Sequence, residues 1–208
     1  MTTEGTVRLG AQKRRGSYAK TEETRRMILD AALEVFAESG YRSGSLREVA
    51  LRVGMSEAGL LHHFRNKSSL LAAVLERRDD QSRELINLDP EAGIESLKGL
   101  VYLADYNTTV PGVVELYCTL SAEATAPAHP AHEYFVNRYT TTRAFTAAAF
   151  TVMLQRGQLR PGIDPLSAAR TTIALMDGLQ VQWLLDRDSV DMAEELRTYL
   201  RGLVTIDF

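Results

Sequence analysis

Two helical segments of only about two turns each, joined by a glycine turn, constrain the fold of this 208-residue chain more than any other feature. The first opens with Ser45-Leu46-Arg47-Glu48, a capping box in which the serine hydroxyl and the glutamate carboxylate each satisfy a free backbone N–H. Gly54-Met55 ends it, and Ser56 caps a second segment whose apolar residues are Leu60, Leu61 and Phe64. Helices this short are unstable alone. We therefore expect a helix-turn-helix that packs on the preceding helix and presents its second helix outward.

The preceding segment predicts an amphipathic helix from Thr21 to about Ser39. Thr21 is a candidate N-cap, acidic residues follow it in the first turn, and Gly40 supplies a left-handed end. The apolar residues recur at intervals of three and four: Ile28, Leu29, Ala32, Leu33, Val35 and Phe36. Residues 1–20 show no such period and place glycines among basic residues, which predicts a flexible basic arm.

The rest of the chain also predicts helices. One opens with Leu70, Leu71, Val74 and Leu75 and runs from Ser68 toward Ile86, and five more follow, separated by proline and aspartate turns: 94–106, 112–125, 132–155, 166–185 and 192–203. No stretch alternates as a strand does. We predict an all-α fold of about nine helices. A small three-helix head with the helix-turn-helix spans residues 21–67, and a larger helical-bundle body spans residues 68–208.

Charge is distributed unevenly along the chain. Residues 1–67 hold 12 Lys/Arg and 8 Asp/Glu, whereas residues 68–208 hold 12 and 19. This asymmetry is compatible with a polyanion-binding head on a body that does not bind polyanions. The longest run without a charged residue, 144–155, is too short to span a bilayer, and no apolar segment follows the N-terminal basic residues as in a signal peptide. We expect a cytoplasmic protein that does not enter the membrane.

Metal and catalytic chemistry find no support in the residue pattern. A single cysteine, Cys118, leaves no partner for a disulfide within the chain or for a Cys-x-x-Cys pair. The four histidines lack zinc-motif spacing: His62, His63, His129 and His132. No nucleophile elbow or glycine-rich phosphate loop occurs. We therefore expect no cofactor, no metal and no enzymatic activity.

Four sequence motifs occur in order at fixed spacing: AALEVFAESGY at 31–41, SLREVA at 45–50, VGMS at 53–56 and LLHHFRNKSSLL at 60–71. Over roughly residues 21–75 they resemble the TetR family of bacterial transcription regulators. The resemblance implies a homodimer whose heads enter successive major grooves of double-stranded operator DNA. It also implies a pocket in each body whose small-molecule effector moves the heads apart. Two residues depart from the family pattern: Leu61 stands where tyrosine is usual, and Gly59 where Thr, Ser or Ala is common.

The resemblance places candidate DNA contacts on the helix-turn-helix. Arg47 matches a position that reaches a guanine edge or a phosphate, the alternative being a local pair with Glu48. Lys67 would hold a phosphate together with backbone N–H groups at the start of the next helix. The full candidate set is Ser45, Arg47, Ser56, Glu57, Ala58, Gly59, His62, His63 and Lys67. Lys13, Arg14, Arg15 and Lys20 form either a DNA-contacting arm or a solvated basic tail.

In the body, apolar and amphipathic residues are either core or the lining of a ligand cavity with a few polar groups. The candidates are Tyr102, Tyr106, Tyr117, Met153, Met176, Gln180 and Trp183. Asp177 and Glu123 are acidic residues in apolar helical stretches, where they either recognise a basic ligand group or cap or pair within a dimer seam. The helices 166–185 and 192–203 are expected to form that seam, because 166–185 carries apolar residues on more than one side.

These observations predict a ligand-responsive DNA-binding transcription regulator, a repressor released from its operator by a small-molecule effector. The helix from Ser68 toward Ile86 would transmit ligand binding, because it alone continues from the recognition unit into the body. Two alternatives stay open. One is an effector-independent DNA-binding module, and the other is a helical small-molecule-binding protein or enzyme with a vestigial head.

Overall fold

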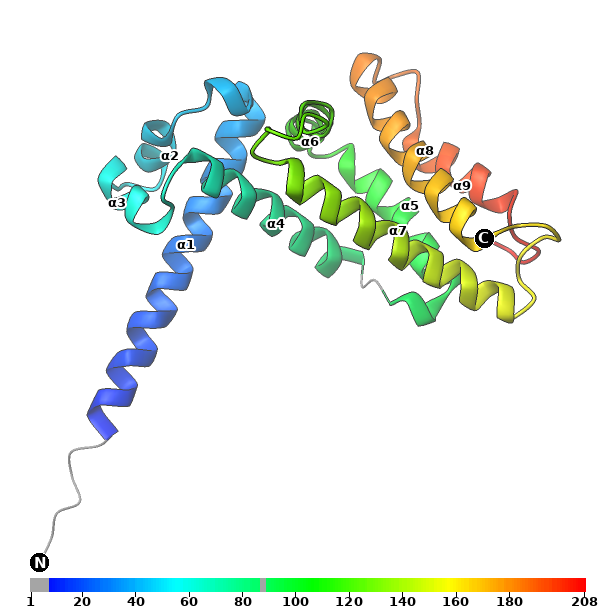
Figure 1. Cartoon of the computed structure of the whole chain (residues 1–208), viewed down its shortest axis with the longest axis horizontal. Helices are drawn as coiled ribbons and strands as arrows, with labels where there is room; N and C mark the ends of the chain where they lie inside the picture. Colours follow the sequence, from blue (N-terminus) through cyan, green and yellow to red (C-terminus); the bar gives the residue numbers. More distant parts are fainter. Residues whose placement is uncertain (1–7, 87–88) are drawn as a thin grey trace, which may run out of the picture. The chain divides into compact units, whose positions relative to one another are not determined.

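The computed structural model describes the backbone of residues 8–86 and 89–208, and the side chains of residues 21–86 and 89–208. Within these ranges every regular segment is helical, which confirms the all-α expectation, and a lone β-bridge joins Leu159 to Val204. No helix among them is both long and apolar enough to cross a membrane. The elements (Figure 1) are α1 (Arg8–Ser43), α2 (Leu46–Arg52), α3 (Glu57–His63), α4 (Lys67–Ile86), the 3-10 helix η1 (Pro90–Ala92), α5 (Ile94–Asn107), α6 (Pro111–Glu123), α7 (His132–Gln155), α8 (Pro165–Leu185) and α9 (Met192–Arg201).

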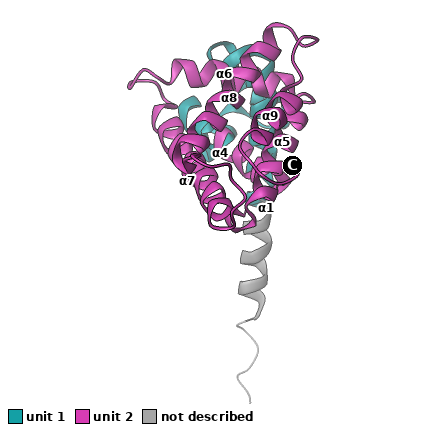
Figure 2. Ribbon diagram, turned by 90° about the vertical axis from the view of Figure 1, so that its right-hand side faces the viewer, with its two compact units in different colours: residues 1–74 teal, residues 75–208 magenta. Residues whose placement is uncertain are grey.

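The chain divides into two compact units, residues 1–74 and residues 75–208, named the head unit and the body unit from here on (Figure 2). The division falls inside α4, beyond the boundary after Lys67 that the sequence suggested. The first residues of α4 belong to the head unit because they contact the end of α1. The Lys67 ammonium donates to the Arg42 carbonyl at 3.0 Å, and the Ser68 and Tyr41 hydroxyl oxygens lie 3.3 Å apart.

The first helix begins earlier than Thr21, the N-cap that the sequence pattern predicted. α1 starts at Arg8 and runs through Gly10 and Gly16, so residues 8–20 are helical rather than a flexible arm. The segment is rich in Leu, Ala, Gln, Lys and Arg, which are good helix formers, and extending an existing helix is far easier than nucleating one. The arm prediction for residues 1–7 lies outside the described residues. So do the side chains of Lys13, Arg14, Arg15 and Lys20.

Glycines close the junction between α1 and α2. Gly40 has φ +73°, a left-handed conformation that ends the regular part of α1, as the sequence predicted. At Gly44 a Cβ atom would lie 2.9 Å from Phe36 Cδ1 and 3.1 Å from the Gly40 carbonyl oxygen. Gly44 is therefore the residue that lets α2 approach α1 closely, above a core that includes the fully buried Phe36 and Leu60.

The core of the body unit lies among α5, α7, α8 and α9. In α9, Leu196 and Leu200 are fully buried, whereas Glu194 and Glu195 are exposed, so this short helix presents one apolar side to α5 and α8. The C-terminal residues are tied to the loop after α7 by backbone hydrogen bonds, such as that from Thr205 N to the Gln158 carbonyl at 2.9 Å. The result is a helical bundle closed by its own C-terminus.

The structure explains why the sequence of α8 is apolar on more than one side. Five of its apolar side chains are buried in the core of a single chain: Ala169, Ile173, Met176, Leu179 and Trp183. The opposite side carries exposed small and apolar residues, here called the α8 stripe: Ala174, Gly178, Val181 and Leu185. The exposed side of α9 is charged or polar instead. The apolar residues of α9 are used inside the chain, so α9 would add polar side chains to a seam with α8, and its part in a dimer stays a prediction.

Candidate DNA-binding helix and body-unit polar network

Two buried apolar residues hold the second helix of the helix-turn-helix. In α3, Leu60 is fully buried and Phe64, which caps the helix, is 3% exposed. Glu57, Ala58 and His62 are exposed, while Gly59 and His63 are half-buried. The exposed surface of α3 therefore consists of small, acidic and imidazole side chains that can approach a groove edge, together with the apolar Leu61.

Both serines of the candidate set act as helix caps. The Ser45 hydroxyl accepts the Glu48 N–H at 3.1 Å, and the Ser56 hydroxyl accepts the Gly59 N–H at 3.1 Å. Each cap satisfies a backbone donor that a two-turn helix cannot pair by itself. Both serines are exposed, so the hydroxyl proton of each remains able to donate to a phosphate.

Arg47 and Arg52 lie on different sides of α2. Arg52 pairs with Glu38 of α1, with Glu34 at 3.3 Å and with Glu48 at 3.4 Å. The hydrogen bond from Arg52 lowers the pKa of the Glu38 carboxyl. Glu48 is thus engaged by Arg52 and not by Arg47. Arg47 is exposed and forms no ion pair with any described residue, so its guanidinium is available for DNA.

Lys67 points into the head unit. Its ammonium donates to the Arg42 carbonyl and lies 4.7 Å from the centre of the Tyr41 ring, in cation–π geometry. Burial lowers the pKa of the Lys67 ammonium. Beside it, the Asn66 side-chain oxygen accepts the Ser69 N–H at 2.8 Å and caps α4. The side chain therefore links the end of α1 to the start of α4.

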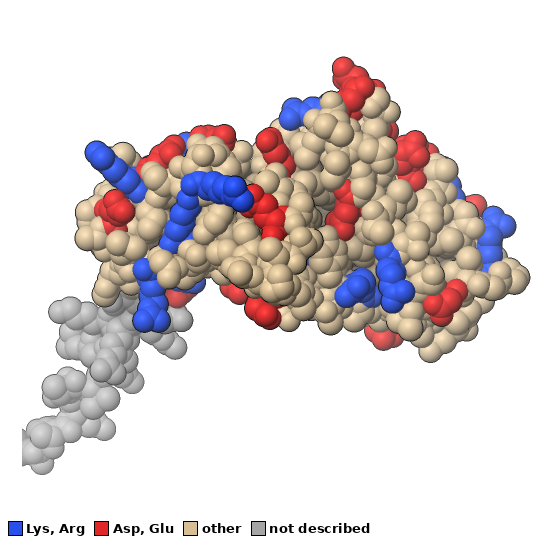
Figure 3. Space-filling view, turned by 45° about the horizontal axis from the view of Figure 1, so that its top comes forward, with Lys and Arg blue, Asp and Glu red and all other residues tan. Residues whose placement is uncertain are grey.

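The positive excess of the N-terminal part lies outside the helix-turn-helix. Residues 21–67 hold seven Lys/Arg and seven Asp/Glu, so the excess resides in residues 1–20. On the face drawn in Figure 3, basic side chains lie among acidic ones rather than in one cluster. The helix-turn-helix therefore offers individual basic side chains such as Arg47 and not a uniform positive surface.

The structure separates the candidate ligand residues into two groups. Tyr117, Met153, Met176, Gln180 and Trp183 are buried, and of these Met176 and Gln180 line one narrow crevice. Tyr102 and Tyr106 are 52% and 41% exposed on α5. Their side chains do not enter the core. The side of α5 that faces the core is occupied by Leu100, Val101, Leu103 and Ala104.

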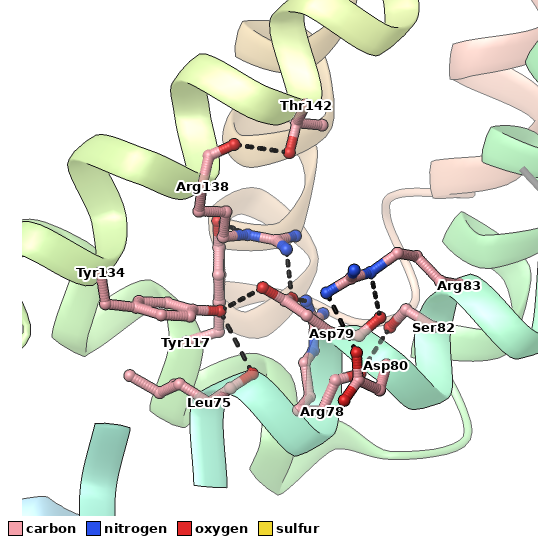
Figure 4. A network of polar contacts seen from close by, with 10 residues as sticks. All are labelled: Leu75, Arg78, Asp79, Asp80, Ser82, Arg83, Tyr117, Tyr134, Arg138 and Thr142. Atoms are coloured by element: carbon pink, nitrogen blue, oxygen red, sulfur yellow. Dashed lines mark hydrogen bonds and ion pairs between the residues drawn. The ribbon is translucent and has the colours of Figure 1, made fainter. Parts of the chain in front are cut away.

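A buried polar network joins three helices of the body unit (Figure 4). Asp79 of α4 forms an ion pair with Arg138 of α7 and accepts a hydrogen bond from the Tyr134 hydroxyl at 2.6 Å. Arg138 in turn donates through Nε to the Tyr117 hydroxyl of α6 at 2.9 Å. Arg78 adds a second guanidinium 4.9 Å from the centre of the Tyr117 ring. The network fixes the body end of α4 against α6 and α7.

Sequence reasoning missed this network. A pattern pointed to it, however, because Arg78 and Asp79 continue the spacing of Leu71, Val74 and Leu75 on the inner side of α4. Charged residues that follow an apolar stripe at helical spacing are buried and must find partners.

The two acidic residues singled out in the body have different partners. Asp177 accepts a hydrogen bond from the Tyr139 hydroxyl at 2.7 Å, and burial raises the pKa of its carboxyl. Glu123 lies 3.5 Å from the His129 ring at the end of α6. Neither carboxylate lies on the α8 stripe.

Comparison with known proteins identifies the family. Residues 28–74 match the family model of bacterial regulatory proteins of the tetR family, and residues 113–205 match that of the C-terminal part of BetI-type transcriptional repressors. The chain belongs to the TetR family. It is 27% identical over 194 residues to the HTH-type transcriptional regulator UidR of Escherichia coli (strain K12), covering 89% of this chain and 95% of UidR.

Solved structures of other proteins share the fold. NalD, described as the secondary repressor of the MexAB-OprM multidrug efflux pump in Pseudomonas aeruginosa, is 28% identical with a TM-score of 0.66, covering 89% of this chain and 98% of NalD. The complex of SmeT with triclosan superposes with a TM-score of 0.74 at 23% identity, covering 88% and 92% of the two chains, a likeness of fold alone.

The two departures from the TetR family pattern both lie on the surface of α3. Leu61 is 40% exposed where a tyrosine would offer a hydroxyl, so this position contributes apolar contact alone. At Gly59 a Cβ atom would lie 3.3 Å from the Ser56 hydroxyl oxygen. Glycine therefore leaves room for the capping serine at this position of the TetR family helix.

Proposed function

We propose that this transcription regulator is a repressor that binds operator DNA through the outer side of α3 and releases it when a small molecule binds in the body unit. The observation that carries the DNA-binding role is the two-sided character of α3. Leu60 anchors it, while Glu57, Ala58 and His62 remain exposed. A short helix that exposes small and polar side chains fits the major groove and reads base edges there.

Around this helix we assign supporting roles. Arg47 contacts a phosphate or a guanine from α2, Ser45 and Ser56 contact phosphates near the helix caps, and the basic residues of 1–20 add sequence-independent affinity. Lys67 positions α4 against α1 instead of contacting DNA, because its ammonium is engaged by the Arg42 carbonyl. The protein acts in the cytoplasm, where its operator DNA is.

The α8 stripe is the proposed dimer seam. Val181 and Leu185 are 48% and 83% exposed, and Gly178 has no atom within 4 Å of where its Cβ would be, so another backbone can approach closely. A two-fold dimer needs a self-complementary surface, which one apolar helix crossing its own copy provides. Two heads in fixed relation then match two half-sites on DNA.

Coupling between ligand and DNA is proposed to run through α4. This helix begins in the head unit and ends in the body unit, where Asp79 is held by α7. An effector that favours a different arrangement of α6 and α7 would shift α4 toward a position that binds DNA less well. By reciprocity, DNA would weaken effector binding by the same factor by which the effector weakens DNA binding. The similarity to NalD and SmeT, both described as repressors of multidrug efflux pumps, supports the repressor role, and the SmeT complex with triclosan supports the binding of a small molecule.

The first test is a titration of the purified full chain into labelled duplex DNA of random sequence at several salt concentrations. The second screens a compound library for molecules that release the protein from a DNA sequence selected for tight binding. We expect affinity to fall as salt rises, with a slope of about 0.9 per phosphate contact, and at least one compound to release DNA. Absence of DNA binding contradicts the proposal. DNA binding that no compound affects favours an effector-independent module, for which the narrowness of the body-unit crevice is the supporting observation.

A further inference from the structure

Three arginines of the head unit form no ion pair with any described residue: Arg25, Arg47 and Arg65. Arg26, the neighbour of Arg25 on α1, pairs instead with Glu23. Arg47 belongs to the surface already proposed to contact DNA. A cation without a counter-charge in its own chain attracts external anions. Arg25 and Arg65 therefore carry charge that the described part of the head unit does not neutralise.

Phe64 brings these two arginines to one end of α3. It caps the C-terminus of the helix, where its N–H donates to the Leu60 carbonyl at 3.0 Å. The Arg25 guanidinium lies 4.4 Å from the centre of the Phe64 ring, in cation–π geometry. Arg65 follows Phe64 directly and is exposed. One arginine from α1 and one from the residue after the cap thus place two positive charges at the C-terminal end of α3.

The contact with Phe64 occupies the face of the Arg25 guanidinium and leaves its edge free. All five N–H donors of a guanidinium lie in its plane, so they can bond to oxygen atoms while the face rests on an aromatic ring. The Arg25 side chain is half-buried and already held in place, so less entropy is lost when it binds. Phosphate accepts two parallel hydrogen bonds from such a fork. Arg25 is therefore prepared to bind a phosphate.

The length of α3 decides which phosphates its ends can reach. Its 7 residues span about 10 Å at about 1.5 Å per residue. The major groove that it is proposed to enter is about 12 Å wide and is bordered by the two phosphate backbones. Both ends of so short a helix stay near these borders. Long basic side chains at its C-terminal end therefore face the DNA backbone.

We propose that Arg25 and Arg65 form a second phosphate-binding site of the head unit, at the C-terminal end of α3, and that they bind neighbouring phosphates of the operator backbone. This inference rests on the proposed binding of operator DNA by α3. The site extends the DNA contact to α1, outside the helix-turn-helix. Together with the contact proposed for Arg47, it fixes the register in which the exposed side chains of α3 meet base edges.

The salt dependence of DNA binding by the full chain tests this site. Arg25→Met removes the charge but keeps an unbranched side chain over the Phe64 ring, where a thioether sulfur also makes favourable contact. We expect this variant to lower the salt slope by about 0.9 and to weaken binding about tenfold at fixed salt. Arg26→Met is the matched control, because Arg26 is the next residue of α1, is exposed and is paired with Glu23. It should leave the slope unchanged.

Arg65→Met changes an exposed side chain, so it keeps the proposal testable even if Arg25→Met fails to fold. It should also lower the salt slope by about 0.9, and the two replacements together by about 1.8. An unchanged slope in either folded single variant overturns the proposal. An equal loss in Arg26→Met also overturns it, because the effect would then follow from overall charge and not from this site.

Single methylphosphonates, which are neutral, locate the contact on a DNA sequence selected by the unaltered chain. We expect two neighbouring positions at which the substitution weakens the unaltered chain about tenfold and no longer weakens the variant with both Arg25→Met and Arg65→Met. The position that Arg47→Met makes insensitive should be a different one. Identical sensitivity profiles of the unaltered chain and the double variant overturn the site, while the DNA-binding role of α3 stands. Absence of DNA binding by the unaltered chain overturns both.

Discussion

The Tyr134 hydroxyl of α7 lies 2.6 Å from a carboxylate oxygen of Asp79 on α4, and 3.3 Å from the backbone oxygen of Leu75 one turn earlier. A single phenol thus contacts both a side chain and the backbone of the helix that continues into the head unit. Because Asp79 also pairs with Arg138, its carboxylate is the centre on which the body end of α4 depends.

Asp79→Asn should lower the free energy of unfolding by about 3 kcal/mol, because the buried Arg138 guanidinium loses its counter-charge. The neighbouring Asp80→Asn is the matched control. Asp80 is exposed and pairs only with Arg83 at 3.2 Å among the described residues, so its loss should cost less than about 1 kcal/mol. Urea unfolding at one protein concentration measures both, and equal effects of the two variants would contradict the network.

Asp177→Asn should stabilise the protein at pH 7. Burial raises the pKa of the Asp177 carboxyl in the folded state, so the charged form destabilises the fold above that pKa. As pH falls through the raised pKa, the carboxyl takes up a proton and the penalty disappears, so the advantage of the amide should shrink toward about pH 4. Thermal unfolding between pH 4 and pH 8 measures this. An advantage independent of pH, or one equal to that of the exposed Asp188→Asn, would count against it.

Replacement of Arg47 and replacement of Lys67 should have different effects on DNA binding. Arg47→Met should reduce the salt slope by about 0.9, the loss of one phosphate contact, or relax the sequence preference if it reads a base. Lys67→Met should leave the slope unchanged and lower stability by about 1 kcal/mol, because its ammonium pairs with the Arg42 carbonyl. Anisotropy titrations at several salt concentrations decide this, with Arg170→Met in the body unit as the control. A lower slope for Lys67→Met would restore its role as a phosphate contact.

Val181→Glu should dissociate the dimer, because a carboxylate would be buried in the centre of the α8 stripe. Val136→Glu is a closely matched control, since Val136 on α7 is 47% exposed and Val181 is 48% exposed. Light scattering at micromolar concentration should give one chain's mass for the first variant and two for the second. A single-chain mass for the unaltered protein would refute the α8 stripe as a dimer seam.

Local sequence patterns predicted the parts of this molecule that depend on local interactions. The caps at Ser45 and Ser56 and the end at Gly40 involve residues no more than four positions apart, and all three occur as expected. The start of α1 was misplaced, because Thr21 resembles a cap but the residues before it also favour a helix. A cap pattern does not exclude an earlier start.

Contacts between residues far apart in the chain could not be predicted from local sequence patterns. Asp79 and Arg138 are 59 positions apart, and nothing local pairs them. The side to which Tyr102 and Tyr106 point depends on which stripe of α5 the other helices cover. Lys67 was expected to face DNA, and its direction is set by the Arg42 carbonyl 25 positions away.

The central claim is that α3 reads a two-fold operator, and selection of binding sites from a random duplex library tests it most directly. The unaltered full chain should enrich two inverted half-sites about 10 base pairs apart from centre to centre, since two major grooves on one face of DNA have that spacing. Replacing Ala58 and His62 together, by Ala58→Gln and His62→Ala, should abolish or change the selected bases while leaving affinity for random DNA within about threefold, because phosphate contacts carry that affinity. Enrichment of the same sequence by the double variant, or of no sequence by the unaltered protein, would contradict the account.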